Sequence, residues 1–333
     1  MKGFDGMNPI IIALDAMGGD NAPGAIVQGA VLAIAEMPVN ILLVGREDAI
    51  NAELEKLPNW PRDRISILHA PDVIETHEVP TTAIRRKRDS SLIVGLKAVK
   101  EGQAAAFVSA GSTGALLTGA TVKVGRAPGI ERPALGALLP CRDGFTFLVD
   151  CGANVDAKPY YLLQFAQMGS AYMTKALGIK NPKVGLINIG AEKEKGNMLV
   201  KEAYDLLEDS ELNFVGNVEA RDVPLGSVDV AVCDAFVGNV VLKYTEGMAK
   251  ALMGMVKDEL MADPVSKVGA LLAKGAFKRI KKRLDYDEIG GAPFLGLNAL
   301  IVKAHGSSNA KAIKGAIRQC VKFIGTEGSN NGI

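Results

Sequence analysis

The sequence predicts a mostly parallel β-sheet covered by helices on both faces, a three-layer α/β/α sandwich that also carries a helical hairpin. Short apolar runs recur along the chain, and most are followed by a polar or glycine-rich turn and then by a helical pattern. Parallel strands need such crossovers, because each new strand must start at the same edge of the sheet. The expected strands are Ile10–Leu14, Asn40–Gly45, Ile65–Ala70, Ala104–Ala110, Phe145–Asp150, Val184–Gly190, Phe214–Asn217, Val228–Asp234 and Ala299–Val302.

Three further segments complete the expected fold. Leu135–Pro140 and the strand that starts at Phe145 are expected to form an antiparallel hairpin, with the turn at residues 141–144. Helical patterns over Ala115–Thr121, Met198–Leu207 and Ala310–Cys320 follow expected strands. Because no repeat, low-complexity tract or linker interrupts the chain, residues 1–333 are predicted to form one α/β domain, with two interleaved lobes as the alternative.

Composition describes a globular protein with a large core. The chain has 333 residues, 48% of them hydrophobic, a mean hydropathy of +0.16 and a net charge of +1. This charge gives no global field that favours nucleic acid, so any electrostatic recognition depends on local patches. No run of eighteen apolar residues and no secretory signal are seen, so a cytoplasmic protein is expected.

Cysteine and histidine usage argues against metal chemistry. The four cysteines show no CxxC spacing, and there are three histidines. Neither a zinc site nor a disulfide framework is therefore expected, and the default compartment is a reducing cytoplasm. We predict no metal and no cofactor.

The first candidate site residues follow the first expected strand. Ile10–Leu14 runs into a turn that contains Asp15, Gly18, Gly19 and Asp20. Ligands of open α/β sheets bind at the carboxyl ends of strands, so this turn is expected at the rim of a binding site. Its adjacent glycines do not match the spaced glycines of a dinucleotide fingerprint. A tight turn capped by an aspartate is the alternative.

A second turn has the composition of an anion site. Ser109, Gly111, Ser112, Thr113 and Gly114 lie between a buried strand and a helix, where backbone N–H groups, hydroxyls and a helix N-terminus come together. We expect this turn to bind phosphate, although small residues there could serve only close helix packing.

A run of four basic residues lies upstream of this turn, from Arg85 to Arg88. Charge runs are usually solvated, and some of these side chains must face water. Arg85 and Lys87 are our candidates for holding an oxyanion.

Later strand ends repeat the pattern of polar residues beside glycine. A strand end with a carboxylate or an amide is often only a helix cap. The recurrence at several ends favours a site, and we include Asp150, Asn154, Lys195, Asp234, Asn239 and His305. A histidine at a strand-to-helix junction can transfer protons near neutral pH.

Residues 247–287 have a different pattern, typical of a helical hairpin. Apolar stripes at helical spacing are interrupted at Asp263-Pro264, with a further change of face at Gly275. An apolar face beside basic residues suits an anionic membrane surface. Packing in a dimer interface is the alternative. The candidate membrane residues are Leu271, Leu272, Phe277, Lys278, Lys281 and Lys282.

Several motifs in one order resemble the acyl-ACP:phosphate acyltransferase family of bacterial phospholipid synthesis. They are DAMGGDNAP, VSAGSTGAL, GIERPAL, DCGANVD, NIG…KGN, CDAFVGNVVLK and GAPFLG…HGSS, and they extend from Ile10 to about Phe323. The resemblance implies a fold like that of isopropylmalate dehydrogenase and phosphotransacetylase, and a homodimer. It also implies peripheral contact with the inner face of the cell membrane, where a glycerol-3-phosphate acyltransferase consumes the product.

Five positions depart from the pattern associated with this family. Ser112 stands where the family has Asn, and Ala191 stands where it has Glu. The others are Ala105 for Asp, Ala235 for Gly and Val237 for Thr. Neither the change at Ser112 nor that at Ala191 removes a group that the expected mechanism requires.

The resemblance implies that acyl-ACP and inorganic phosphate react to give acyl phosphate and free carrier protein. Phosphate is already an anion, so it needs a cage more than a base: the turn at residues 109–114 and basic residues among 85–87 could supply one. Lys195 could neutralise the attacking phosphate, Asn239 could donate to the thioester oxyanion, and His305 or Lys195 could protonate the leaving thiolate. The aspartates would orient these groups.

Three alternatives remain open at this point. A dehydrogenase of related fold would bind a nicotinamide cofactor, and a phosphotransacetylase would prefer acyl-CoA to acyl-ACP. A non-catalytic protein that docks on membranes through the hairpin would leave acyl-ACP unchanged. An acyl-enzyme on a cysteine is disfavoured, because no cysteine lies beside a histidine in a recognised motif.

Overall fold

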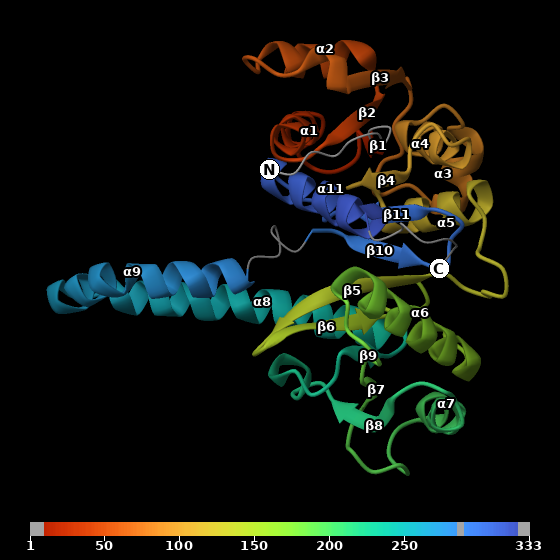
Figure 1. The fold of residues 1–333 in the computed structure, drawn as a ribbon, viewed down its shortest axis with the longest axis vertical. Coiled ribbons are helices and arrows are strands. Elements are labelled where there is room, and N and C mark those ends of the chain that lie inside the picture. Colours follow the sequence, from red (N-terminus) through yellow and green to blue (C-terminus); the bar gives the residue numbers. More distant parts are fainter. Residues whose placement is uncertain (1–9, 285–289, 326–333) are drawn as a thin grey trace. The chain divides into compact units, whose positions relative to one another are not determined.

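A computed structural model describes residues 10–284 and 290–325 (Figure 1). The chain divides into two compact units. The first contains the described residues of 10–136, 171–180 and 290–325, and the second contains 137–170 and 181–284. Two of the boundaries between the units fall within a strand and a helix, β5 (Ala134–Cys141) and α6 (Pro159–Leu177). The assignment of residues 1–333 to one domain stays a prediction, and residues 285–287 of the expected hairpin lie outside the described residues.

The first unit contains a sheet with the strand order β3-β2-β1-β4-β11-β10, and β10 also pairs with the start of β5. All neighbours from β3 to β11 are parallel, whereas β10 is antiparallel to both of its partners. The sequence analysis predicted no strand over the residues of β10. The strands are β1 (Ile10–Asp15), β2 (Val39–Gly45), β3 (Ile65–His69), β4 (Ala106–Ser109), β10 (Ala292–Leu295) and β11 (Leu300–Lys303).

Helices cover both faces of this sheet, which confirms the predicted three-layer arrangement in this unit. Ile12 and Leu14 of β1 are buried in a core with residues of α1 and α11, while α4 contacts the strands from the other side (Figure 1). The fit is close, because a β carbon on Gly95 of α4 would lie 2.1 Å from the Phe107 ring. The helices are α1 (Gly24–Glu36), α2 (Glu47–Glu55), α3 (Pro80–Arg86), α4 (Ser91–Lys100), α5 (Thr113–Lys123) and α11 (Ala310–Gly325), with the 3-10 turn η1 (Arg62–Arg64).

The second unit has a parallel sheet in the order β6-β9-β7-β8, and most of β5 lies beside β6 as the other arm of the expected hairpin. The β7–β8 pair contains an irregularity in register near Val184. On α6, Gly169 approaches β9 so closely that a β carbon there would lie 2.8 Å from Val230 Cγ1. The remaining elements are β6 (Gly144–Val149), β7 (Val184–Asn188), β8 (Phe214–Glu219), β9 (Val230–Val232), α7 (Met198–Glu208) and η2 (Val223–Leu225).

A helical hairpin extends from the second unit, as predicted. Its arms are α8 (Ala235–Leu260) and α9 (Pro264–Leu284), which lie side by side (Figure 1). The break falls at the expected place, because Asp263 accepts hydrogen bonds from the N–H groups of Val265 and Ser266 and so caps α9. Its first arm starts earlier than expected, and α9 continues through Gly275 without a break.

Candidate active site

Two buried side chains join the ends of neighbouring strands in the first unit. Asp15 ends β1 and Ser109 ends β4, and the Ser109 hydroxyl donates to Asp15 Oδ2 at 2.7 Å. Ser109 Oγ in turn accepts from the Gly111 N–H at 3.1 Å. Burial raises the pKa of Asp15, and the Ser109 hydrogen bond partly offsets this effect. The carboxyl group therefore supports the shape of the β4–α5 turn from within the core.

Glycines allow the β1–α1 turn to lie directly against the β4–α5 turn. A β carbon on Gly18 would lie 2.8 Å from the Gly111 nitrogen, and one on Gly19, whose φ is +104°, would lie 2.8 Å from Ala110 Cβ. The backbone N–H of Asp20 donates to the Gly306 carbonyl at 2.8 Å. Three strand ends thus meet as predicted, and the close approach explains why glycine occupies these positions.

The β4–α5 turn presents the N-terminus of α5. Ser112 caps this helix, since its hydroxyl accepts from the Ala115 N–H at 3.4 Å. The N–H groups of Thr113 and Gly114 belong to the first turn, so they have no intrahelical acceptor, and both residues are half-buried. This arrangement can bind an anion through backbone N–H groups.

The start of α3 lies near this turn. Pro80 begins α3 and lies close to Gly114, where a β carbon would be 2.9 Å from Pro80 Cγ. Arg85 is exposed in the last turn of α3. This neighbourhood is compatible with the expected role of Arg85 in holding an oxyanion.

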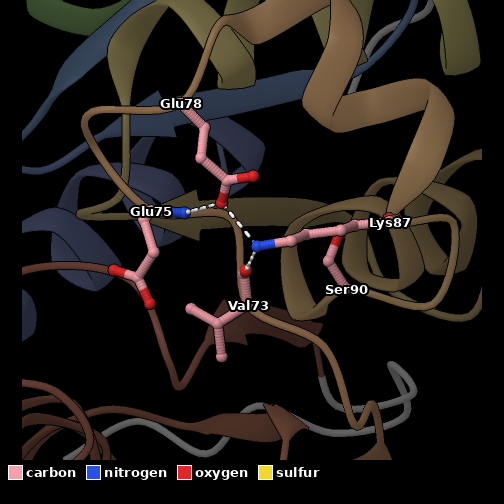
Figure 2. Close-up of polar contacts among 5 residues, drawn as sticks. All are labelled: Val73, Glu75, Glu78, Lys87 and Ser90. Atoms are coloured by element: carbon pink, nitrogen blue, oxygen red, sulfur yellow. Dashed lines mark hydrogen bonds and ion pairs between the residues drawn. The ribbon is translucent and has the colours of Figure 1, made fainter.

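Lys87, which directly follows α3, has its partners in the loop before that helix. Figure 2 shows its ammonium group bound to the Glu78 carboxylate and to the Val73 carbonyl, where the Nζ–O distance is 2.6 Å. The same Glu78 carboxylate accepts from the Glu75 N–H at 2.7 Å. The hydrogen bond from Lys87 is the main cause that lowers the pKa of Glu78. Lys87 therefore holds the loop before α3, and its expected contact with phosphate stays a prediction.

The β11–α11 turn contains the predicted His305 and a lysine that the sequence analysis missed. His305 is exposed, and its Nδ1 lies 2.8 Å from Ser307 Oγ and 3.2 Å from the Ser307 nitrogen. Lys303 ends β11 opposite Ser109, and its ammonium group donates to the Ala110 carbonyl at 3.2 Å. A lysine that directly follows the apolar run Leu300–Val302 was the signal that could have revealed it.

The remaining candidates lie in the second unit. Asp150 is buried at the end of β6 and binds the turn after it: its carboxylate accepts from the N–H groups of Gly152, Ala153 and Asn154 at 3.0, 2.9 and 2.8 Å. The Asn154 side chain adds a bond of 2.7 Å from its Nδ2. Four hydrogen bonds on one carboxylate assign Asp150 to shaping this turn.

Asp234 and Asn239 lie near the start of α8. The Asp234 carboxylate caps the helix, because it accepts from the N–H groups of Phe236 and Val237 at 2.9 and 3.0 Å. A β carbon on Gly238 would lie 1.9 Å from the Asp150 carbonyl, so the helix start touches the end of β6. Asn239 is exposed one residue later.

Lys195 lies in the turn between β7 and α7. Its side chain is exposed, and it forms no ion pair with any residue in the described ranges. The neighbouring Lys193 is paired with Asp205 at 3.0 Å and with Glu208 at 2.5 Å, both on α7. Of the two lysines, Lys195 is therefore the one whose charge can act on a ligand.

Three of the cysteines, Cys151, Cys233 and Cys320, are poor nucleophiles. All four cysteines lie in the described part of the chain and form no disulfide. Burial raises the pKa of Cys151 and Cys233 well above the ordinary thiol value and that of Cys320 to about 12. These thiols stay protonated at neutral pH. Among the residues that the structure describes, no three His, Cys, Asp or Glu side chains gather as metal ligands.

Comparison with known proteins shows the family. The model of a family described as "Fatty acid synthesis protein" matches residues 10–330. A phosphate acyltransferase of Clostridium kluyveri is 52% identical over 312 residues, which cover 94% of this chain and 93% of that protein. One of Clostridium botulinum is 53% identical over 311 residues, covering 93% and 92%.

Solved structures with low sequence identity share the fold. A phosphotransacetylase from Streptococcus pyogenes has a TM-score of 0.65 at 18% identity and covers 95% of this chain and 94% of that one. A branched-chain phosphotransacylase from Enterococcus faecalis has a TM-score of 0.58 at 15% identity, covering 95% and 99%. The predicted fold and the family resemblance are thus confirmed, and the chain belongs to the fatty acid synthesis protein family that includes these phosphate acyltransferases.

Proposed function

We propose that this protein is a phosphate acyltransferase that converts acyl-ACP and inorganic phosphate into acyl phosphate and free acyl carrier protein. A phosphate oxygen attacks the thioester carbonyl, the C–O bond forms, and the C–S bond breaks to release the carrier thiolate, which takes up a proton. The reaction balances without an oxidant or a reductant. Identity above 50% to phosphate acyltransferases over nearly the whole chain is the observation that carries this proposal.

Within the first unit, the β4–α5 turn is the proposed phosphate-binding element. Backbone N–H groups of Thr113 and Gly114 point outward from the start of α5 and bind the phosphate oxygens. Lys303 adds a positive charge beside Ala110, and Arg85 adds a second cation. Asp15 acts through Ser109 to fix the shape of the turn, since a carboxylate facing phosphate would repel it.

Three polar residues have proposed roles in the acyl transfer step. Lys195 neutralises the attacking phosphate, and Asn239 donates to the oxyanion that develops on the carbonyl oxygen. An oxyanion donor of this kind contributes roughly 3–4 kcal/mol in other enzymes. His305 protonates the leaving thiolate. Each role predicts a loss of kcat on substitution by alanine in a protein that keeps its fold.

The test uses the purified full chain with a long-chain acyl-ACP, with and without phosphate. Acyl phosphate is trapped with hydroxylamine, and the released carrier thiol is followed in the same sample. We expect both products in equal amounts and only with phosphate. Release of thiol without acyl phosphate would mean hydrolysis and overturn the proposal. Competition between acyl-CoA and acyl-ACP distinguishes a phosphotransacetylase, and titration with NAD or NADP tests a dehydrogenase.

The hairpin is the proposed contact with an anionic membrane surface. Leu271 and Leu272 of α9 are 70% and 84% exposed, and Lys278 is exposed on the same helix, while Phe277 is half-buried. The side chains of Lys281 and Lys282 lie outside the described residues. Within the described ranges, no helix is both long and apolar enough to cross a bilayer. Exposed leucines beside basic residues suit a surface contact, which would place the protein peripherally at the inner face of the cell membrane and near the acyltransferase that uses acyl phosphate.

Homodimerisation is the second proposed use of the hairpin. Exposed apolar side chains recur every fourth residue along α8, so that consecutive members of the series are neighbours on the helix surface and offer apolar area to a partner helix. These residues are Phe236, Val240, Tyr244, Met248 and Leu252.

One pair of substitutions separates the two uses. Leu271→Glu with Leu272→Glu should abolish flotation with phosphatidylglycerol vesicles and leave the mass in solution that of a dimer. Leu225→Glu, at an exposed leucine of η2, is the matched control. A monomeric double variant would assign the two leucines to the dimer interface, and unchanged flotation would exclude them from membrane contact.

A further inference from the structure

Two buried side-chain amides hold the turn that carries Lys195. Asn188 Nδ2 donates to the Lys195 carbonyl at 3.1 Å, and Asn217 Nδ2 donates to the Glu192 carbonyl at 2.9 Å. The Lys195 N–H donates to that same Glu192 carbonyl at 3.2 Å. Both ends of the short segment from Glu192 to Lys195 are therefore bound by amides that come from two different strands.

A β-bulge brings the second amide to this turn. In the β7–β8 pair Val184 lies opposite Phe214 but Leu186 lies opposite Asn217, so Gly185 faces two residues of β8. One of these two is Gly216, whose φ of +92° favours glycine. One extra residue reverses the faces of all residues after it, and it places Asn217 on the same face of the sheet as Asn188.

Two glycines bring the lysine close to this support. Gly196 follows Lys195 with a φ of +93°, and a β carbon there would lie 2.5 Å from Asn188 Oδ1. A β carbon on Gly190 would lie 3.3 Å from Lys195 Cγ, so the lysine stem extends over the Gly190 backbone. The turn therefore lies directly against Asn188, and the start of the Lys195 side chain lies beside Gly190.

We propose that Asn217 is a positioning residue that acts on the acyl transfer through Lys195. The inference rests on the proposed function, in which the Lys195 ammonium stabilises the attacking phosphate. Such a charge contributes only where the geometry is held, because a displacement of about 1 Å can cost as much as a hundredfold in rate. Asn217 supplies this constraint from a buried position without touching a substrate.

The side-chain oxygen of Asn217 decides which substitution tests this role. Its Oδ1 is buried and has no hydrogen-bond partner among the described residues. A buried acceptor without a donor destabilises the fold, so replacing the amide with an apolar group of similar size should cost little stability. Asn217→Leu should therefore unfold at nearly the temperature of the wild type while the turn loses its hydrogen bond.

The experiment compares Asn217→Leu, Lys195→Ala and the double variant in the acyl phosphate assay, with thermal unfolding of each. We expect Asn217→Leu to lower kcat roughly three- to tenfold, the effect of losing about one hydrogen bond in the transition state. The loss of activity in Asn217→Leu should divide between kcat and KM in the same way as the loss in Lys195→Ala. In the Lys195→Ala background the same substitution should cause no further loss.

Asn213→Leu is the matched control. Asn213 precedes β8, and its Nδ2 donates to the Asn181 carbonyl at 3.0 Å, so an amide-to-carbonyl bond is lost at the other end of the strand. This variant should keep wild-type kcat. If Asn217→Leu does not fold, Gly196→Ala replaces it, since it displaces the exposed turn from Asn188 while the sheet is left intact.

The outcomes distinguish this inference from the function itself. An inactive wild type overturns the proposed function. With an active wild type, normal kcat in Asn217→Leu, or an equal loss with and without Lys195, overturns the positioning role alone. Normal kcat in Lys195→Ala also overturns it, because Asn217 would then have nothing to position.

Discussion

Ser109 and Asp15, which are 94 residues apart in the sequence, form a hydrogen bond of 2.7 Å where β4 and β1 end side by side. Because Ser109 Oγ also accepts from the Gly111 N–H, the turn that we assign to phosphate is connected to a buried carboxyl group. The shape of the proposed phosphate site therefore depends on a residue that does not touch phosphate.

Ser109→Ala should weaken both stability and phosphate binding. It removes the Ser109 hydroxyl that donates to the buried Asp15 carboxyl, which should cost about 1–3 kcal/mol of unfolding free energy. Loss of the acceptor for the Gly111 N–H should also raise the KM for phosphate. Denaturant unfolding and initial rates at varied phosphate check the two effects. Thr146→Val is the control, because it removes a buried hydroxyl that donates to the Val228 carbonyl. It should cost stability but leave the KM for phosphate unchanged.

Asp15 should make stability fall as the pH rises. Its pKa is raised in the folded protein, so the folded state binds the proton more tightly than the unfolded state. The contribution to stability is fully present below about pH 4 and is lost as the pH rises through the folded pKa. Asp15→Asn cannot titrate and should gain stability relative to the wild type between pH 4 and 8. A constant difference across this range would contradict the prediction, and Asp20→Asn is the exposed control.

Tyr172 should cause a similar loss of folding stability at alkaline pH. Burial raises its pKa to about 12, although its hydroxyl lies 2.8 Å from Gln319 Nε2. Stability is fully present below about pH 10 and is lost as the pH approaches 12, by up to about 3 kcal/mol. Tyr172→Phe should remove this part of the alkaline loss, as measured by denaturant unfolding from pH 9 to 11.5. Tyr160→Phe changes an exposed tyrosine and should leave the curve unchanged.

Lys87 and Glu78 should act as a pair. Because their ion pair joins the residues that flank α3, Glu78→Gln and Lys87→Met should have the same effect on the KM for phosphate, within about twofold. Arg85→Ala should raise that KM further. A larger increase in Lys87→Met than in Glu78→Gln would show that the lysine contacts phosphate itself. Phosphate titrations at constant acyl-ACP make the comparison.

Local sequence determined much of the fold. Apolar runs such as Ile10–Asp15 become central strands because both faces are buried, and each is followed by the small residues that a strand-to-helix turn requires. Ser112 and Asp263 mark helix starts, because their side chains bind backbone N–H groups only two or three residues away. Such signals act over a single turn of chain and can be read without a structure.

Only the tertiary structure decided which polar groups act on one another. Lys303 reaches the Ala110 carbonyl across 193 residues, and no local pattern predicts that contact. The basic run predicted Lys87 as an oxyanion ligand beside Arg85, whereas the structure pairs Lys87 with Glu78. Asn217 reaches the Lys195 turn because a bulge shifts the register of β8 by one residue. Strand pairing and register set the contacts of Lys303 and Asn217, and both depend on contacts between segments far apart in the chain.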